Sequence, residues 1–131
     1  MYASKMGVMM RNIKILVIIP AYNEEKNLAK TIEEVREKAP FVDILVVDDG
    51  STDSTAEIAR RMSVKVISLP FNMRIGGAVQ TGLMYAKKKG YNIAIQIDAD
   101  GQHDPRYIKD IIKPILENKA NIVIGSRFVQ K

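Results

Sequence analysis

The sequence predicts an α/β fold, in which a Rossmann-like, mostly parallel sheet carries helices on both faces. Short apolar runs rich in β-branched residues alternate with helical patterns from residue 13 onward. The apolar runs are continuous rather than alternating, which is typical of strands that are buried on both faces of a parallel sheet. The length of 131 residues suits one domain. We therefore expect a loose tail over residues 1–12 and a single domain over residues 13–131.

Five strands and four intervening helices are expected, in chain order. The predicted strands span residues 13–19, 44–47, 64–69, 93–97 and 122–124. The helices are expected to begin at Asn23, at Asp53 or Ser54, after a loop over residues 72–77, and at Pro105. Pro40 ends the first helix and Gly90 closes the third. Each helix has apolar residues three or four positions apart, which gives it one buried face.

Composition and charge limit the classes of function. The chain is 47% hydrophobic and 27% charged, as in ordinary globular proteins, and has no cysteine, which excludes disulfides and thiolate metal sites. No apolar run approaches the ~20 residues of a membrane helix. The net charge of +5 permits an anionic partner such as a nucleotide or a lipid phosphate. The basic residues are scattered apart from Lys87 to Lys89, which suit a solvated helix end, and no nucleic-acid partner is expected.

Asp98 and Asp100 are the sharpest chemical feature of the sequence. They follow the fourth predicted strand, and residues two apart in extended backbone point the same way. Two neighbouring carboxylates repel each other unless a cation or a proton intervenes. Mg²⁺ or Mn²⁺ would relieve this repulsion and bind a diphosphate, and Gln102 offers a further oxygen. The alternative is that both aspartates only build a turn or cap a helix.

Two other loops follow predicted strands and carry polar groups. Asp48 and Asp49 end the second strand, where a carboxylate can accept hydrogen bonds from a ribose diol or a base N–H, or can simply support a turn. The loop over residues 72–77 is suited to approach phosphates with backbone N–H groups. Neither a P-loop nor a dinucleotide-binding glycine pattern is present.

Four segments resemble, in the right order, the motifs of the inverting glycosyltransferase family 2. These segments span residues 17–25, 46–53, 98–105 and 124–128. The third resembles the version found in polyprenyl- and dolichyl-phosphate sugar transferases. The resemblance covers about residues 13–128 and implies a GT-A fold and inverting sugar transfer from a nucleotide-diphosphate sugar. A polyprenyl phosphate is the most plausible acceptor.

The resemblance also implies roles for individual residues. The nucleotide-binding positions are Pro20, Tyr22, Glu24, Asp48, Asp49 and Asp98. Asp98, Asp100 and Gln102 would bind the Mg²⁺ or Mn²⁺ ion, with Asp98 contacting either the ribose or the water shell of the metal. Arg127 would neutralise phosphate charge. Arg74 stands where relatives commonly have glycine, so it either strains the loop or adds a phosphate contact.

The last expectations concern the extent and location of the chain. Family members continue well past the segment at residues 124–128, so we expect a donor-binding part without its acceptor-binding region or catalytic base. Such a part is expected to self-associate through exposed apolar surface. We expect a cytoplasmic chain, peripheral to the inner face of the membrane if the acceptor is a polyprenyl phosphate. A non-catalytic sugar-nucleotide-binding module remains an alternative, and a nucleotidyltransferase is less favoured because no glycine-rich basic loop follows the first strand.

Overall fold

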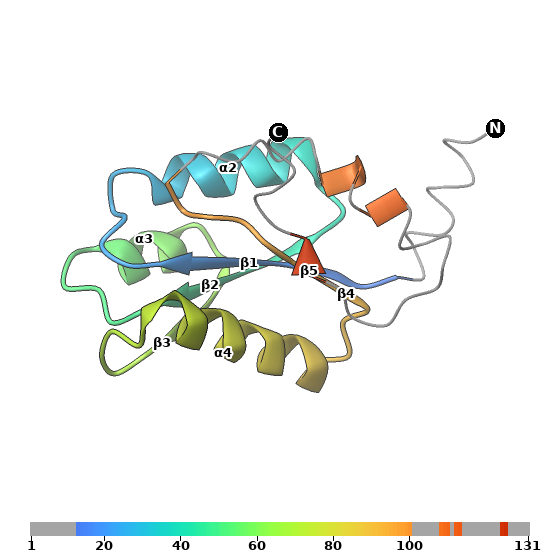
Figure 1. Cartoon of the computed structure of the whole chain (residues 1–131). Coiled ribbons are helices and arrows are strands. Elements are labelled where there is room, and N and C mark those ends of the chain that lie inside the picture. The colour runs from blue at the N-terminus through green and yellow to red at the C-terminus, as the bar shows by residue number, and fades with distance from the viewer. Residues whose placement is uncertain (1–12, 101–107, 111, 114–123, 126–131) are drawn as a thin grey trace.

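A parallel sheet forms the centre of the molecule. The structure, a computed structural model, describes residues 13–100, 108–110, 112–113 and 124–125. Its strands are β1 (Ile15–Ala21), β2 (Asp43–Asp48), β3 (Lys65–Ser68), β4 (Ile93–Gln96) and β5 (Ile124–Gly125). They pair in parallel in the order β3-β2-β1-β4-β5 (Figure 1). The predicted α/β fold with a parallel sheet is therefore confirmed, while the predicted tail over residues 1–12 lies outside the described residues.

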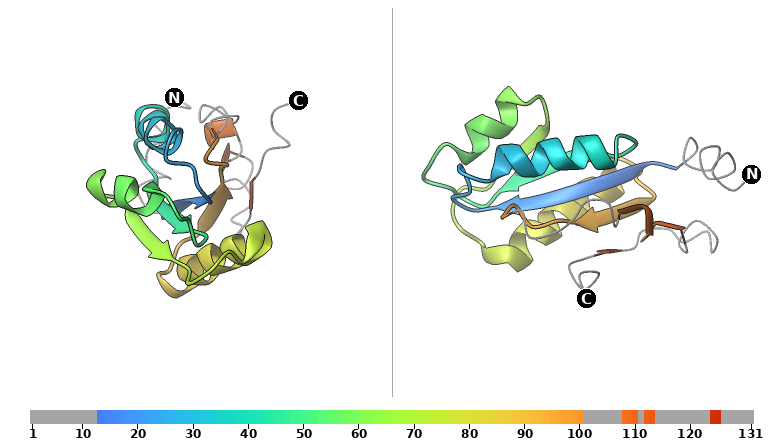
Figure 2. Two further views of the ribbon diagram at one scale, coloured as in Figure 1. Left: turned by 90° about the vertical axis from the view of Figure 1, so that its left-hand side faces the viewer. Right: turned by 90° about the horizontal axis from the view of Figure 1, so that it is seen from above.

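Helices cover both faces of this sheet. The helices α2 (Leu28–Lys38) and α3 (Thr55–Arg61) lie on one face, and α4 (Arg74–Lys88) lies on the other (Figure 2). Ile108 and Ile112, from the described helical residues near the end of the chain, belong to the core on the α2 side. None of the described helices combines the length and the hydropathy needed to cross a bilayer.

The central strand β1 is buried from both sides. Its odd-numbered residues Ile15, Val17 and Ile19 belong to the core beneath α2, and Leu16 and Ile18 belong to the core above α4. Both sets of side chains are therefore apolar, which explains the continuous hydrophobic run in the sequence.

Small residues on α4 allow this helix to approach the sheet closely. Its buried positions are Ala78, Gly82 and Ala86. A Cβ atom at Gly82 would lie 2.6 Å from Cγ2 of Ile18, so no larger residue fits there without a shift. The position of α4 is thus set by side-chain size as well as by hydrophobicity.

The prediction that Asn23 caps the first helix is wrong. That helix begins at Leu28, and the carbonyl of Glu24 accepts hydrogen bonds from Asn27 N–H and Leu28 N–H. Asn23 has a φ of 53°, and its Oδ1 accepts from the N–H of Thr52 at 2.8 Å. A side chain that is held by the neighbouring loop is not available to cap the helix.

The loop predicted over residues 72–77 is shorter than expected, because α4 begins at Arg74. Gly76 and Gly77 are therefore helical. A tertiary contact holds the residue just before the helix: Oδ1 of Asp49, directly after β2, accepts a hydrogen bond from Met73 N–H at 2.6 Å. Gly90 closes α4 with a φ of 77°, as predicted.

The second helix has the side-chain cap that the sequence predicted. Of the two candidates, Asp53 accepts a hydrogen bond from Thr55 N–H at 2.9 Å, whereas Ser54 makes no side-chain capping bond. The cap helps α3 to begin immediately after the loop that follows β2.

Candidate functional site

The order of the strands creates a crevice at one edge of the sheet. From β1 the chain moves through α2 to β2 and then through α3 to β3, outward in one direction. The helix α4 then carries it back across the opposite face to β4, on the other side of β1. The direction of the strand order thus reverses between β1 and β4, which are neighbours in the sheet. Parallel α/β sheets bind ligands at this reversal point.

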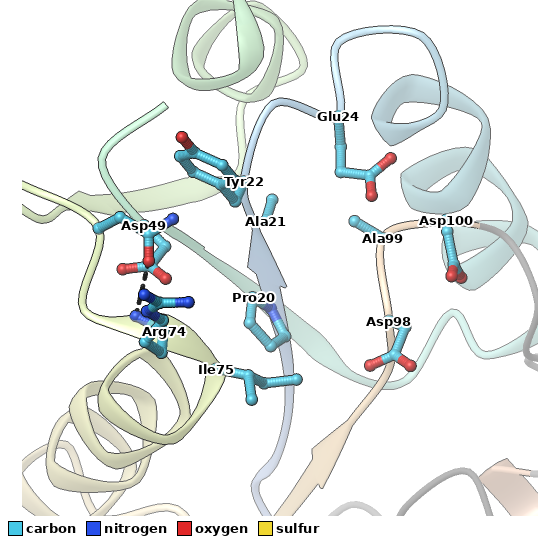
Figure 3. Close-up of a pocket in the computed structure, with 11 residues that line it drawn as sticks. Pro20, Ala21, Tyr22, Glu24, Asp49, Arg74, Ile75, Asp98, Ala99 and Asp100 are labelled. Carbon is cyan, nitrogen blue, oxygen red and sulfur yellow. Dashed lines mark hydrogen bonds between the residues drawn. The ribbon is translucent and has the colours of Figure 1, made fainter. Parts of the chain in front are cut away.

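A cleft of about 440 Å³ lies at that point. Its lining residues are Pro20, Ala21, Tyr22, Glu24, Asp49, Asn72, Arg74, Ile75, Asp98, Ala99 and Asp100. They come from the ends of β1, β2 and β4 and from the start of α4. In Figure 3, Tyr22, Asp49 and Arg74 lie on one side, Asp98 and Asp100 on the other, and Pro20 and Ile75 between them.

Asp49 joins the cleft to the start of α4. Its side chain is only 4% exposed, and its Oδ1 accepts from Met73 N–H. Oδ2 accepts no hydrogen bond from the other described residues and belongs to a carboxylate that lines the cleft. One side chain can therefore hold the helix with one oxygen and a ligand with the other.

Asp48 has a different environment. Its Oδ1 accepts from Ser51 N–H at 3.0 Å, its side chain is buried, and it is not among the residues that line the cleft. The structure thus separates two adjacent aspartates that the sequence treated together, and it places only Asp49 beside the cleft.

Reciprocal hydrogen bonds fix the loop after β1 to the loop after β2. Asn23 N–H donates to Oγ of Ser51 at 2.9 Å, and Glu24 N–H donates to Oγ1 of Thr55 at 2.9 Å. In the other direction, Ser54 N–H donates to Oε1 of Glu25 at 3.0 Å. These bonds hold residues 23–25, directly after Tyr22, so that Tyr22 and Glu24 project from a fixed loop.

Asp53 is the ionisable centre of this loop pair. Burial opposes its ionisation, but hydrogen bonds from the hydroxyl and N–H of Thr55 and from Glu25 N–H outweigh that effect and lower the pKa of Asp53. The carboxylate is thus favoured by the same contacts that join the loops.

Asp98 and Asp100 flank a buried alanine at the end of β4. Ala99 is buried, and its carbonyl accepts from Oγ1 of Thr31 on α2 at 3.0 Å. The aspartates on either side line the cleft, and in Figure 3 both carboxylates extend on its β4 side. Oδ1 of Asp98 also accepts from Nε2 of Gln96 at 3.2 Å. The bond from Thr31 anchors the segment and so orients both carboxylates.

The two carboxylates suit a hard divalent cation that shares its ligands with a substrate. Within the described part of the chain, no three acidic or histidine side chains meet in a group that could enclose a metal. Mg²⁺ commonly takes one or two carboxylates and completes its coordination with water and substrate phosphates. Asp98 and Asp100 supply two carboxylates beside an open cleft, so their oxygen donors fit a bound Mg²⁺ or Mn²⁺ ion.

Most of the predicted site residues that the structure describes meet in this cleft. Those that line it are Pro20, Tyr22, Glu24, Asp49, Arg74, Asp98 and Asp100. Gln102 and Arg127 lie outside the described residues, and their roles remain predictions. Ile75 lies within the loop predicted over residues 72–77, but no role was predicted for its side chain, which lines the cleft from the first turn of α4.

Comparisons with known proteins show which family the chain resembles. The model of the family "Glycosyl transferase family 2" matches residues 16–131. An undecaprenyl-phosphate mannosyltransferase of Micrococcus luteus is 35% identical over 89% of this chain and 49% of its own length. A UDP-N-acetylglucosamine–dolichyl-phosphate N-acetylglucosaminyltransferase of Methanococcus voltae is 37% identical over 86% of this chain and 51% of its own length. The chain spans about half the length of these relatives.

A solved structure shares the fold. The glucosyl-3-phosphoglycerate synthase of Mycobacterium tuberculosis, in complex with Mn²⁺, uridine-diphosphate-glucose and phosphoglyceric acid, superposes with a TM-score of 0.72. It is 25% identical, and the match covers 86% of this chain and 43% of that one. A fold of this kind therefore accommodates both a sugar nucleotide and a divalent ion.

Proposed function

The chain belongs to glycosyl transferase family 2, and we propose that its cleft binds a nucleotide-diphosphate sugar for inverting transfer to a polyprenyl phosphate. One observation carries the proposal: the cleft places Tyr22 and Asp49 opposite the carboxylates of Asp98 and Asp100. One side suits a nucleoside and the other suits a metal-bound diphosphate, so a sugar nucleotide matches the cleft from end to end.

The nucleoside is proposed to lie against the ends of β1 and β2. Pro20 and Tyr22 present apolar and aromatic surface to a base, and the side-chain oxygens of Glu24 and Asp49 accept hydrogen bonds from ribose hydroxyls or a base N–H. The fixed loop after β1 favours binding, because little backbone freedom is lost when the ligand enters. Asp48 is retained as a weaker candidate, since its described bond is to Ser51.

The diphosphate is proposed to lie between the start of α4 and the end of β4. Asp98 and Asp100 would hold Mg²⁺ or Mn²⁺, with Gln102 as a further oxygen donor. When bound, such an ion offsets the negative charge that develops on a departing diphosphate. The guanidinium group of Arg74, at the rim, would add a charge-assisted hydrogen bond to phosphate. Arg127 is proposed for the same task.

The acceptor is proposed from the relatives, which are named for undecaprenyl phosphate and dolichyl phosphate. A phosphate acceptor is already an anion at neutral pH and needs less help from a general base than a hydroxyl does. Such an acceptor would bring the chain to the surface of a membrane.

The test measures where each part of the donor binds. Titration calorimetry would compare uridine, guanosine and thymidine with their diphosphates and diphosphate sugars, with and without Mn²⁺. We expect Asp49→Asn to weaken binding of the matching nucleoside as well as the whole donor, while its side-chain oxygen still accepts from Met73 N–H.

Asp110→Asn is the matched control, because Asp110 is an exposed carboxylate on a helical segment away from the cleft. It should leave both affinities unchanged. Normal nucleoside binding by Asp49→Asn, with weaker binding of the diphosphate alone, would show that Asp49 has been assigned to the wrong part of the donor.

A further inference from the structure

Exposed apolar side chains concentrate on one side of the molecule. The described residues include five large hydrophobic side chains that are exposed: Tyr22, Phe71, Met73, Ile75 and Met84. Four of them belong to the loop before α4 or to α4 itself, and Phe71 and Met84 are 63% and 65% exposed. The fifth, Tyr22, lines the same cleft as Ile75. The exposure is therefore clustered rather than scattered, and it borders the cleft.

The charges on α4 have only one sign. Arg74, Lys87 and Lys88 are its ionisable basic residues, Lys89 follows directly, and residues 70–92 contain no aspartate or glutamate. All four basic residues are exposed. Lys14 adds a further positive charge beside them, because its Nζ donates to the carbonyl of Lys89 at 2.8 Å.

The opposite side of the sheet differs in both respects. The helix α2 has three acidic and three basic residues, Glu33, Glu34, Glu37, Lys30, Arg36 and Lys38. Neither α2 nor α3 has an exposed large hydrophobic side chain. Among the helices labelled in Figure 1, Figure 2 shows α4 on one face of the sheet and α2 and α3 on the other. A general need for solubility would act on both faces alike, so it does not explain why, of these three helices, only α4 has exposed apolar side chains and charges of a single sign.

The spacing on α4 places the apolar and basic groups along its outer side. Its buried residues Ala78, Gly82 and Ala86 lie one turn apart on the inner side. Met84 lies about half a turn away from Gly82 and Ala86, at 100° per residue, and Lys87 lies about one turn beyond Met84. Met73 lies over Gly77, where a Cβ would come within 2.8 Å of the Met73 Cβ. The outer side thus carries Met73 at the start of α4 and Met84 together with Lys87 and Lys88 at its end.

We propose that this side of α4, with the loop before it, docks on the surface of an anionic lipid bilayer. Interfacial helices bind bilayers by inserting apolar side chains while Lys and Arg interact with acidic headgroups. Phe71, Met73 and Met84 supply the first kind of contact, and Lys87 to Lys89 supply the second. Docking in this way brings the start of α4, and with it the rim of the cleft at Arg74, toward the membrane. The proposal does not depend on sugar transfer, because bilayer binding is measured without any donor.

The test is cosedimentation of the 131-residue chain with phosphatidylcholine vesicles, with and without phosphatidylglycerol, at low and at high salt. We expect binding only to the anionic vesicles, and weaker binding at high salt because the lysine contacts are screened. A basic residue near an anionic leaflet contributes about fivefold in partitioning. The double variant Lys87→Glu/Lys88→Glu should therefore lose about 25-fold or more. Met84→Gln should lose several-fold without any change of charge.

The matched control is Lys30→Glu/Lys38→Glu, which makes the same change of charge on α2. It should bind the vesicles within about twofold of the unaltered chain. Equal losses in the two double variants would overturn the proposal in favour of a general effect of net charge. Absence of binding to anionic vesicles, or normal binding by the α4 variants, would also overturn it.

Two further measurements distinguish other occupants of this surface. Sedimentation velocity without lipid tests for a second copy of the chain, and competition with a single-stranded RNA tests for a general polyanion. A dimer that the α4 variants abolish, with vesicle binding unchanged, overturns the proposal. RNA that displaces the vesicles, together with normal vesicle binding by Met84→Gln, also overturns it. Circular dichroism melts would confirm that each variant is folded.

Discussion

Arg74→Gly is expected to stabilise the fold and to weaken ligand binding at the same time. Arg74 is the first residue of α4 and has a φ of 69°, a conformation in which any residue with a Cβ is strained. Its N–H donates to Oδ1 of Asn72 at 2.8 Å, and glycine would keep that bond. Its side chain is exposed at the rim of the cleft, so the substitution removes a charge without opening the core.

The two effects have opposite signs and similar sizes. The left-handed conformation costs a non-glycine residue about 1–2 kcal/mol. Replacing Arg74 by glycine removes that cost. Glycine also has more conformational freedom in the unfolded chain, which lowers the free energy of unfolding by about 0.5–1 kcal/mol and offsets part of the stabilisation. The net stabilisation is about 0.5–1 kcal/mol, or about 2–4 °C in Tm for a domain of this size. Loss of one charge-assisted hydrogen bond to phosphate costs about 1.5 kcal/mol at an exposed position, or about tenfold in Kd.

The assay pairs urea unfolding with calorimetric titration of a nucleoside diphosphate. Arg74→Ala is the control, because alanine keeps the Cβ and the strain but lacks the guanidinium group. It should lose the same affinity without gaining stability. If both variants change the free energy of unfolding equally, the strain at position 74 is refuted. Unaltered affinity in both would refute the phosphate contact.

Three other substitutions test separate parts of the structure. Asp100→Asn, or addition of EDTA to the unaltered chain, should weaken diphosphate binding about tenfold or more while nucleoside binding is unchanged; titration calorimetry that shows no effect of either would contradict the metal assignment. Gly50→Ala should destabilise the fold by at least about 2 kcal/mol more than Gly90→Ala in urea unfolding. Both glycines have positive φ, but a Cβ at Gly50 would lie 2.5 Å from the backbone carbon of Phe71 while Gly90 faces open space. Asp53→Asn should lower the free energy of unfolding at pH 7, and the difference from the unaltered chain should disappear in acid. The lowered pKa means that ionised Asp53 stabilises the fold above the unfolded carboxyl pKa of ~3.9, and that this contribution is lost as the pH falls through the folded pKa. A difference that persists at low pH would contradict this account.

The sequence alone was sufficient for the fold class and for most of the candidate site. Strands such as β1 and β2 are continuous apolar runs, because helices cover both faces of a parallel sheet, and this pattern can be read without coordinates. Polar residues that directly follow such strands lie at the carboxyl edge of the sheet, where ligands bind. That local rule was enough to identify Asp49, Asp98 and Asp100 as candidates, and the family resemblance added Tyr22. Whether a residue follows a strand depends only on its position in the chain, so this can be predicted without knowing how the elements pack.

Details that depend on contacts between distant segments were decided by the tertiary structure. Asn23 has the chemistry of a helix cap, but Thr52, 29 residues away, holds its side chain. The residue before α4, Met73, is held by Asp49, 24 residues earlier in the chain, whose Oδ1 accepts from its N–H. Asp48 and Asp49 are both buried, and their partners separate them: Asp48 accepts from Ser51 in its own turn, whereas Asp49 accepts from Met73 beside the cleft. The physical reason is common to all three: side-chain hydrogen bonds between loops depend on which strands are neighbours, and a pattern of local propensity does not contain that information.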